Sequence, residues 1–227
     1  MNAYAETSYY EEELTRLTIL AEQKSLHKDY VRLQLTWNRD VLRYFGRYLP
    51  QQGSDCSMIS LGPFLGILET VLSEHFQTVL LVDMNNEIVF PTNNMQFLAM
   101  NLDSCHWSLP EVTYDVCLMV ELIEHLMWSP VPLLKWVATH SRLAVITTPD
   151  DAEWPPLPPE PYMRYLHFST IPPPFPGCTG NPNAMNHCKQ YECAEFIELL
   201  CRVGLRVLEF QRIGLGHHQM LAICEPR

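Results

Sequence analysis

The sequence lacks any run of about 18 uncharged apolar residues, so no segment is predicted to cross a membrane. Its first residues carry neither the basic start nor the apolar stretch of a secretory signal peptide. The eight cysteines include no Cys-x-x-Cys pair, and their scattered positions favour reduced, mostly buried thiols over a disulfide framework. These absences predict a soluble intracellular protein in the cytoplasm, with the nucleus as the alternative.

Positive charge is also scarce, and the formal net charge is −11. This balance argues against indiscriminate binding of nucleic acid, because phosphate contacts need clustered Lys and Arg. No basic residue occurs from 48 to 134, whereas seven of the fifteen lie in the first 47 positions. Two basic triplets there have a spacing of four residues: Lys24, Lys28 and Arg32, then Arg39, Arg43 and Arg47. On a helix each triplet would form a stripe, either the solvated face of an amphipathic helix or a surface that follows phosphates.

Alternating predicted helices and strands indicate an α/β fold, and 227 residues fit a single domain. Residues 8–49 have helical periodicity and form an N-terminal helical extension within 1–50. Strands are then predicted at 57–61, 78–82, 96–100, 114–120, 142–147, 206–212 and 219–224, and helices at 64–75, 85–90, 130–140 and 191–203. We therefore predict a doubly wound, Rossmann-like, mostly parallel sheet.

Residues 149–187 interrupt this alternation with eleven prolines. So many prolines forbid a regular interior helix or strand. Aromatic residues within the segment favour a packed loop over a flexible linker. We predict an inserted Pro-rich loop or lid.

The most informative stretch is 114–125, where an apolar strand leads into Glu121, Glu124 and His125. We predict a helical turn over 122–128, on which positions i, i+3 and i+4 share one face and can converge on one ion. Carboxylate oxygens and an imidazole nitrogen suit a divalent cation such as Mg²⁺ or Mn²⁺. The alternative is a solvated helix start with a surface or capping His.

A candidate nucleotide pocket follows the first strands. Gly62 and Gly66 open a helix, where glycine lets backbone amides approach a nucleotide-like ligand. Asp83 ends the next strand 21 residues after Gly62, where a carboxylate accepts hydrogen bonds from ribose hydroxyls. Asn101 and Asp103, after the third strand, are predicted beside an adenine, with a plain polar loop as the alternative.

Four ordered motifs, at 59–66, 81–85, 114–126 and 144–149, resemble those of class I S-adenosylmethionine-dependent methyltransferases. The resemblance covers residues 57–225. In that family an acidic residue precedes a Gly-x-Gly-x-Gly loop, whereas Ser60 and Phe64 occupy two of those places here. The resemblance implies that the cofactor is held by Ser60, Gly62, Gly66, Asp83, Met84, Asn101, Asp103 and Glu121.

Within this class the chain is similar to the HEN family, which 2′-O-methylates the 3′-terminal nucleotide of small RNAs with a divalent metal, in RNA-mediated gene silencing. The matches are Glu121-Leu-Ile-Glu124-His125-Leu, Thr148-Pro149 followed by Glu153 and Trp154, His187 followed by Glu195-Phe196, and residues 208–214. The resemblance implies Mg²⁺ or Mn²⁺ on Glu121, Glu124, His125 and His187. His125 and His187 are also the candidates for moving the proton, although a metal-bound imidazole cannot act as a base at the same time. His167, in the Pro-rich loop, is a substitute ligand if His187 points away.

Two other functions stay open. A small-molecule O-methyltransferase, similar to the ubiquinone-pathway enzymes that share Glu-x-x-Glu-His, would explain the acidic balance and the aromatic, Pro-rich lid. A methyltransferase-like interaction module without catalysis would explain why Ser60 and Phe64 depart from the family's acidic residue and glycine-loop pattern. The expected partner is thus an RNA 3′ end or a small hydroxyl acceptor, and the sequence predicts no oligomeric state.

Overall fold

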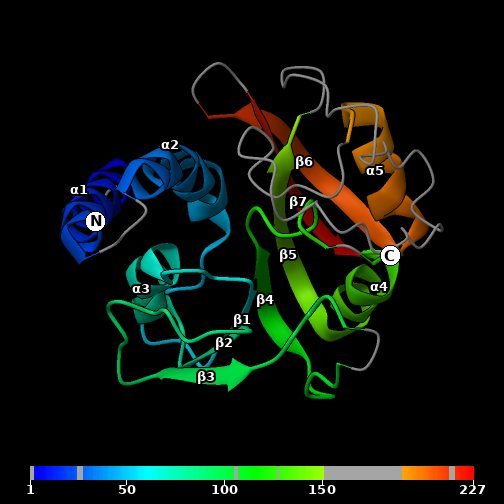
Figure 1. Cartoon of the computed structure of the whole chain (residues 1–227), viewed down its shortest axis with the longest axis horizontal. Coiled ribbons are helices and arrows are strands. Elements are labelled where there is room, and N and C mark those ends of the chain that lie inside the picture. The colour runs from blue at the N-terminus through cyan, green and yellow to red at the C-terminus, as the bar shows by residue number, and fades with distance from the viewer. Residues whose placement is uncertain (1–2, 25–27, 105–106, 127, 151–190, 215–217) are drawn as a thin grey trace.

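The structure is a computed structural model that describes residues 3–24, 28–104, 107–126, 128–150, 191–214 and 218–227. Figure 1 shows two helices at the N-terminus beside a central sheet that has helices on both faces. No described helix is long and apolar enough to cross a membrane. The predicted loop at 149–187 lies outside the described residues except for Pro149 and Asp150.

A single mixed sheet organises the described chain, in the strand order β3-β2-β1-β4-β5-β7-β6. The first five strands are mutually parallel, and β7 pairs antiparallel with both β5 and β6. The strands are β1 Ser57–Leu61, β2 Thr78–Asp83, β3 Met95–Ala99, β4 Tyr114–Met119, β5 Ser141–Pro149, β6 Leu205–Ile213 and β7 Gln219–Pro226. This topology confirms the predicted doubly wound, mostly parallel α/β fold.

Helices pack on both faces because successive strand residues point to opposite sides. Ile59 and Leu61 of β1 join the apolar core beneath α4 and α5, whereas Met58 joins the core beneath α1, α2 and α3. The helices are α1 Ala3–Lys24, α2 Lys28–Phe45, α3 Ile67–Leu72, α4 Val131–His140 and α5 Cys193–Arg202, with short 3-10 helices η1 Gly46–Tyr48 and η2 Ser73–His75.

One predicted helix, at 85–90, is wrong. The structure has no helix between Asp83 and Met95, and this segment crosses the start of α3 as a loop. The Val89 N–H donates to the Leu65 carbonyl over 3.1 Å, and the Ile88 side chain lies against Gly66. These tertiary contacts hold the segment in a non-helical form that local sequence does not reveal.

The N-terminal helices are confirmed, but the first basic stripe is wrong, because Lys24 ends α1 and Lys28 begins α2. The arginines of these helices pair with the protein itself. Arg32 forms an ion pair with Glu22, and Arg39 donates a hydrogen bond of 2.8 Å to Thr15. Arg47 pairs with Glu209 of β6. These contacts favour a structural role for the arginines, on a solvated helix face, over binding to the phosphates of a nucleic acid.

The described cysteines are free thiols. Burial raises the pKa of the Cys224 thiol to about 12. Burial also raises the pKa of the Cys117 thiol on β4. Both therefore behave as small apolar core groups, as the scattered spacing predicts.

Candidate functional site

A pocket of about 220 Å³ opens at the carboxyl ends of β1, β2 and β3. Five of the eight predicted cofactor residues line it, and these come from three consecutive strand ends. They are Gly62 after β1, Asp83 and Met84 at the end of β2, and Asn101 and Asp103 after β3. Leu102, Leu122 and Leu126 supply apolar wall, and His125 also contributes. This edge of a parallel sheet is where ligands bind in doubly wound folds.

Gly62 is required by both its backbone and its neighbour. Its φ of 71° lies in the left-handed region, and its N–H donates to the Val82 carbonyl over 2.8 Å. A Cβ at this position would lie 2.8 Å from Cδ1 of Leu122. The glycine therefore lets the loop after β1 pass close beneath the segment after β4.

Asp83 is oriented by two backbone amides. Its Oδ1 accepts from the Met84 N–H at 2.6 Å, and its Oδ2 accepts from the Phe64 N–H at 3.4 Å. Burial raises the pKa of the Asp83 carboxyl, while these hydrogen bonds oppose the rise. The carboxylate is thus fixed at the pocket wall, with Met84 largely exposed beside it.

The loop after β3 is braced against the segment after β4. Asn101 accepts the Asp103 N–H through its side-chain oxygen at 2.9 Å, and Asp103 accepts the Trp128 N–H at 2.9 Å. These two bonds fix the far wall of the pocket.

Ser60 and Gly66 do not line this pocket. Ser60 is buried, and its hydroxyl donates to Oε1 of Glu69 at 2.6 Å. Gly66 caps the start of α3 with a φ of 66°. Both residues connect the loop to α3 and lie outside the pocket lining.

Glu69 was missed by sequence reasoning. It is 3% exposed, and burial raises its pKa to about 7, with a smaller contribution from the charge of Asp83. The available signal was a carboxylate on the apolar face of a short helix, between Leu68 and Val71. The Glu69 carboxyl therefore lies against Ser60, the position at which class I methyltransferases have an acidic residue before the glycine loop.

A smaller hollow of about 40 Å³ shares Gly62 with the larger pocket. Gln34 and Asn38 of α2 line it together with Glu69, Glu121 and Phe64. Glu121 therefore faces this hollow and not the larger pocket. The two hollows meet at the glycine loop, one with apolar and acidic walls and the other with amide and carboxyl groups.

Of the predicted helical turn over 122–128, the structure shows a single hydrogen-bonded turn from Leu122 to His125, and it places Glu121 before that turn. Glu121 has a left-handed φ of 52°, and one turn follows, in which the His125 N–H donates to the Leu122 carbonyl at 3.0 Å. Because Glu121 stands outside that turn, it does not share a helical face with Glu124 and His125. Its carboxylate instead accepts the Thr147 hydroxyl at 2.7 Å, while its own N–H donates to that hydroxyl oxygen at 2.9 Å.

Glu124 is 1% exposed and incompletely bonded. Oε2 accepts the Thr148 hydroxyl at 3.2 Å, whereas Oε1 has no hydrogen-bond partner within the described part of the chain. Nε2 of His125 lies 3.7 Å from that Oε1. Burial, then the charge of Glu121, raises the pKa of Glu124 well above its usual range. Burial likewise raises the pKa of Glu121 to about 7, opposed by the Thr147 hydroxyl.

The predicted metal centre does not assemble from the residues that the structure describes. Among them, no three His, Cys, Asp or Glu side chains are arranged to hold an ion. Glu121 and Glu124 each turn toward a threonine of β5, which divides the set. His167 and His187 lie outside the described residues, so their proposed roles stay predictions.

No protein-family model and no curated protein matches the sequence. Solved structures do share its fold. A SAM-dependent methyltransferase from Aquifex aeolicus has a TM-score of 0.56 at 18% identity, over 86% of this chain and 93% of its own. One from Mesorhizobium loti has a TM-score of 0.56 at 13% identity, over 79% and 94%. The magnesium protoporphyrin IX methyltransferase of Synechocystis, with bound S-adenosylhomocysteine, has a TM-score of 0.55 at 12% identity, over 84% and 82%.

The chain therefore has the fold of S-adenosylmethionine-dependent methyltransferases. Nothing in these likenesses points specifically to small-RNA methylation, so the resemblance to the HEN family stays a prediction.

Proposed function

We propose that the protein binds S-adenosylmethionine at the carboxyl edge of the sheet and transfers its methyl group to a small hydroxyl acceptor. The observation that carries the proposal is the convergence of Gly62, Asp83 and Asn101, from three consecutive strand ends, on one pocket. In a methyltransferase fold, that convergence favours an adenosine group, with Asp83 accepting from the ribose hydroxyls.

The two hollows together suit the cofactor better than either does alone. The larger pocket, at about 220 Å³, is below the roughly 300–1,000 Å³ usual for small-molecule sites. An adenosine there would leave the methionine part beside Gly62, at the hollow lined by Asn38 and Glu69. A carboxylate and an amide suit an ammonium group, so Glu69 would replace the acidic residue missing at Ser60. When bound, the cofactor supplies an electrophilic methyl group on a sulfonium.

Glu121 is the group best placed to accept the acceptor's proton. It lines the hollow that shares Gly62, and the Thr147 hydroxyl orients its carboxylate. A base whose pKa lies near the working pH transfers protons efficiently, and burial puts Glu121 in that range.

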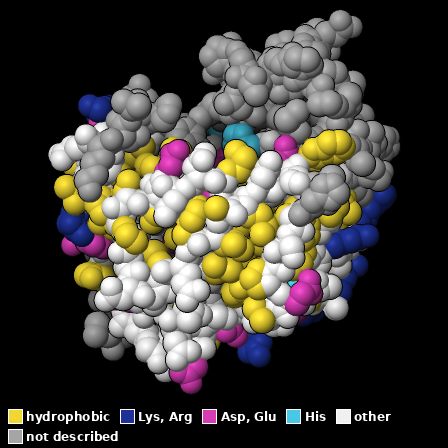
Figure 2. All heavy atoms as spheres, turned by 60° about the horizontal axis from the view of Figure 1, so that its bottom comes forward, with side chains coloured by type: hydrophobic (Ala, Val, Ile, Leu, Met, Phe, Trp, Pro, Cys, Tyr) yellow, Lys and Arg dark blue, Asp and Glu magenta, His cyan; other side chains and the backbone are white. Residues whose placement is uncertain are grey.

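A small acceptor fits the charge distribution better than RNA does. The net charge is −11, and Arg32, Arg39 and Arg47 contact groups of the protein itself. Figure 2 shows the face on the side of β3, where hydrophobic and uncharged side chains fill the centre and Lys and Arg lie at the margins. Phosphate binding needs the opposite distribution.

Metal-assisted 2′-O-methylation of a small RNA's 3′-terminal ribose is the second candidate. Oε1 of Glu124 has no hydrogen-bond partner among the described residues and lies beside Nε2 of His125, which favours this candidate because an ion would use both atoms. The described residues alone do not hold a metal, so this candidate depends on His187.

Three measurements separate the candidates. Calorimetry with S-adenosylhomocysteine tests the cofactor site. Absence of binding would contradict both methyltransferase candidates and would favour an interaction module without catalysis. Transfer of labelled methyl to catechol in the presence of EDTA would support the first candidate. Transfer to a 3′-terminal ribose only with Mn²⁺, abolished in Glu124→Ala with cofactor binding intact, would support the second and contradict the first.

A further inference from the structure

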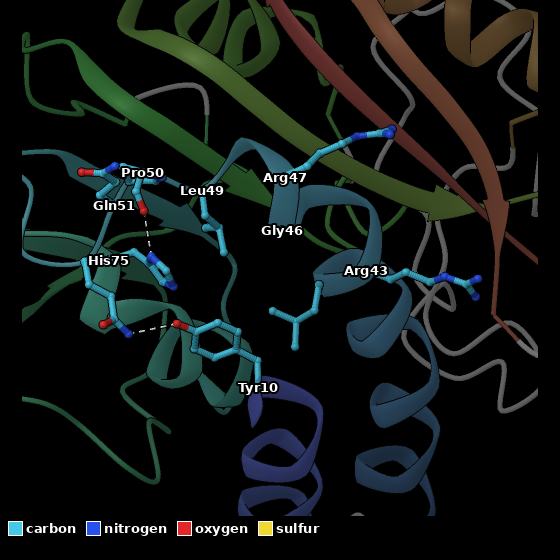
Figure 3. Close-up of a pocket in the computed structure, with 10 residues that line it drawn as sticks. Tyr10, Arg43, Gly46, Arg47, Leu49, Pro50, Gln51 and His75 are labelled. Atoms are coloured by element: carbon cyan, nitrogen blue, oxygen red, sulfur yellow. Dashed lines mark hydrogen bonds between the residues drawn. The ribbon is translucent and has the colours of Figure 1, made fainter. Parts of the chain in front are cut away.

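A cavity of about 490 Å³ lies at the amino ends of β1 and β2, at the opposite end of these strands from the candidate site. It is lined by residues of α1, α2 and η1, of the segment that enters β1, and of η2 (Figure 3). This volume is within the roughly 300–1,000 Å³ usual for small-molecule sites, and none of its lining residues belongs to the site described above.

His75 is rigidly fixed in the wall of this cavity. Its Nδ1 lies 2.8 Å from the Pro50 carbonyl, which only accepts, so Nδ1 is the donor. Its own carbonyl accepts the Ser54 hydroxyl at 3.1 Å. In the neutral ring Nε2 then carries a lone pair, and this buried atom has no partner among the described residues.

Besides His75, the lining combines aromatic and aliphatic side chains with two glutamines and two arginines. The Tyr10 ring lies against the His75 ring, with centroids 5.2 Å apart, and its hydroxyl accepts from Gln52 at 3.0 Å. Leu42 and Leu49 add apolar wall. The cavity thus combines apolar and polar side chains with a buried acceptor, Nε2 of His75, that has no partner among the described residues.

The two arginines at the rim do not turn into the cavity. Figure 3 shows the guanidinium groups of Arg43 and Arg47 pointing away from it, toward β6 and β7. Arg47 pairs with Glu209, and Arg43 lies over the Tyr44 ring at 5.9 Å. Neither arginine therefore offers its charge to an anionic ligand inside the cavity.

We infer that this cavity binds a small uncharged aromatic molecule with one O–H or N–H donor, which donates to Nε2 of His75. A buried acceptor without a partner is costly, and a ligand donor removes that cost. The ring of such a ligand would pack against Tyr10 and the leucines. This second site is separate from cofactor binding, because it lies at the other ends of β1 and β2.

A matched pair of ligands tests the inference on the full chain. We expect 2-naphthol to bind in calorimetry, and its methyl ether, 2-methoxynaphthalene, to bind about tenfold more weakly, because the ether lacks the donor. We expect the ¹⁵N resonance of Nε2 in His75 to move with 2-naphthol and to stay in place with the ether. Absence of 2-naphthol binding, or equal binding of the ether with an unmoved Nε2 resonance, would overturn the inference.

Variants locate the binding. His75→Phe keeps a ring and removes the acceptor, so 2-naphthol affinity should fall about tenfold. The control is His140→Phe on α4, whose ring stacks on Trp136 away from the cavity, and which should bind as the unmodified chain does. Should His75→Phe not fold, the ligand pair and the Nε2 resonance decide. Displacement of 2-naphthol by S-adenosylhomocysteine would contradict a separate site, whatever the outcome for the proposed methyl transfer.

Discussion

The turns after β1 and after β4 are built alike. Each places a residue other than glycine in left-handed conformation, Phe64 at φ 51° and Glu121 at φ 52°. Each lies beside a buried glutamate that accepts from a hydroxyl, Glu69 from Ser60 at 2.6 Å and Glu124 from Thr148 at 3.2 Å. Strain and buried acids of this kind concentrate at functional sites.

The two turns differ in how far their polar groups are satisfied. The Ser60–Glu69 pair is closed by a short bond, and Gly62 in the same loop lines a pocket with groups from β2 and β3. After β4, Oε1 of Glu124 has no partner among the described residues, and the expected metal set is divided. The hydroxyl–carboxyl pair of the first turn is thus complete, whereas within the described residues the second turn keeps a carboxyl oxygen open to a proton, a cation or a substrate group.

The largest effect is expected from Glu69→Gln. The folded pKa of Glu69, about 7, lies above its ordinary value of 4.5, so the protonated form is favoured in the fold. The stability that the protonated Glu69 side chain contributes is complete below pH 4.5 and is lost as the pH rises through about 7. Removing the ionisable group should therefore raise the free energy of unfolding by about 3 kcal/mol at pH 8 and change it little at pH 4. Urea unfolding at the two pH values measures this.

The exposed Glu74 of η2 provides the control, since Glu74→Gln should leave stability unchanged at both pH values. Equal stability of Glu69→Gln and the unmodified chain at pH 8 would show that Glu69 ionises freely in the fold.

Asp83→Ala tests the pocket after β1. Losing a charged acceptor for two ribose hydroxyls should weaken S-adenosylhomocysteine binding by about 2 kcal/mol, or roughly 30-fold. Isothermal calorimetry measures the affinity, and thermal unfolding checks that the variant folds. An unchanged affinity would mean that the ribose does not lie at Asp83.

Gly62→Ala should destabilise the chain by about 1–2 kcal/mol, because alanine is strained at a φ of 71° and its Cβ would press on Leu122. Gly46→Ala is the matched control, since nothing lies within 4 Å of a Cβ there. Chemical denaturation of both variants compares them, and equal stabilities would contradict the tight passage of the loop beneath Leu122.

Ser60→Ala and Thr148→Val compare the two hydroxyl–carboxyl bonds directly. Ser60→Ala should cost about 1.5 kcal/mol and Thr148→Val about 0.5–1 kcal/mol, because the bond of Ser60 is shorter. Unfolding free energies at pH 7 give the order, and the reverse order would show that the turn after β4 is the better satisfied.

The fold was predictable because apolar strands and turn residues alternate, and the observed strand ends lie within about two residues of those expected. The loop containing Ile88 was not, because its form depends on contact with Gly66 and Leu65. Gly62 and Asp83 were predictable from their positions at neighbouring strand ends.

The site after β4 was harder to predict. Glu121, Glu124 and His125 have helical spacing, and only the left-handed φ of Glu121 separates their side chains. Glu69 and His75 acquire their roles from Ser60 and Pro50, which contact them across the fold. Spacing therefore locates strand ends, while the direction of each side chain depends on backbone and packing.

Cofactor binding by the full chain is measured by calorimetric titration with S-adenosylhomocysteine. We expect saturable binding with one molecule per chain, at a Kd of about 1–100 μM, which corresponds to roughly 5–8 kcal/mol. Absence of binding heat at millimolar ligand, confirmed by an unchanged melting temperature, would contradict this expectation.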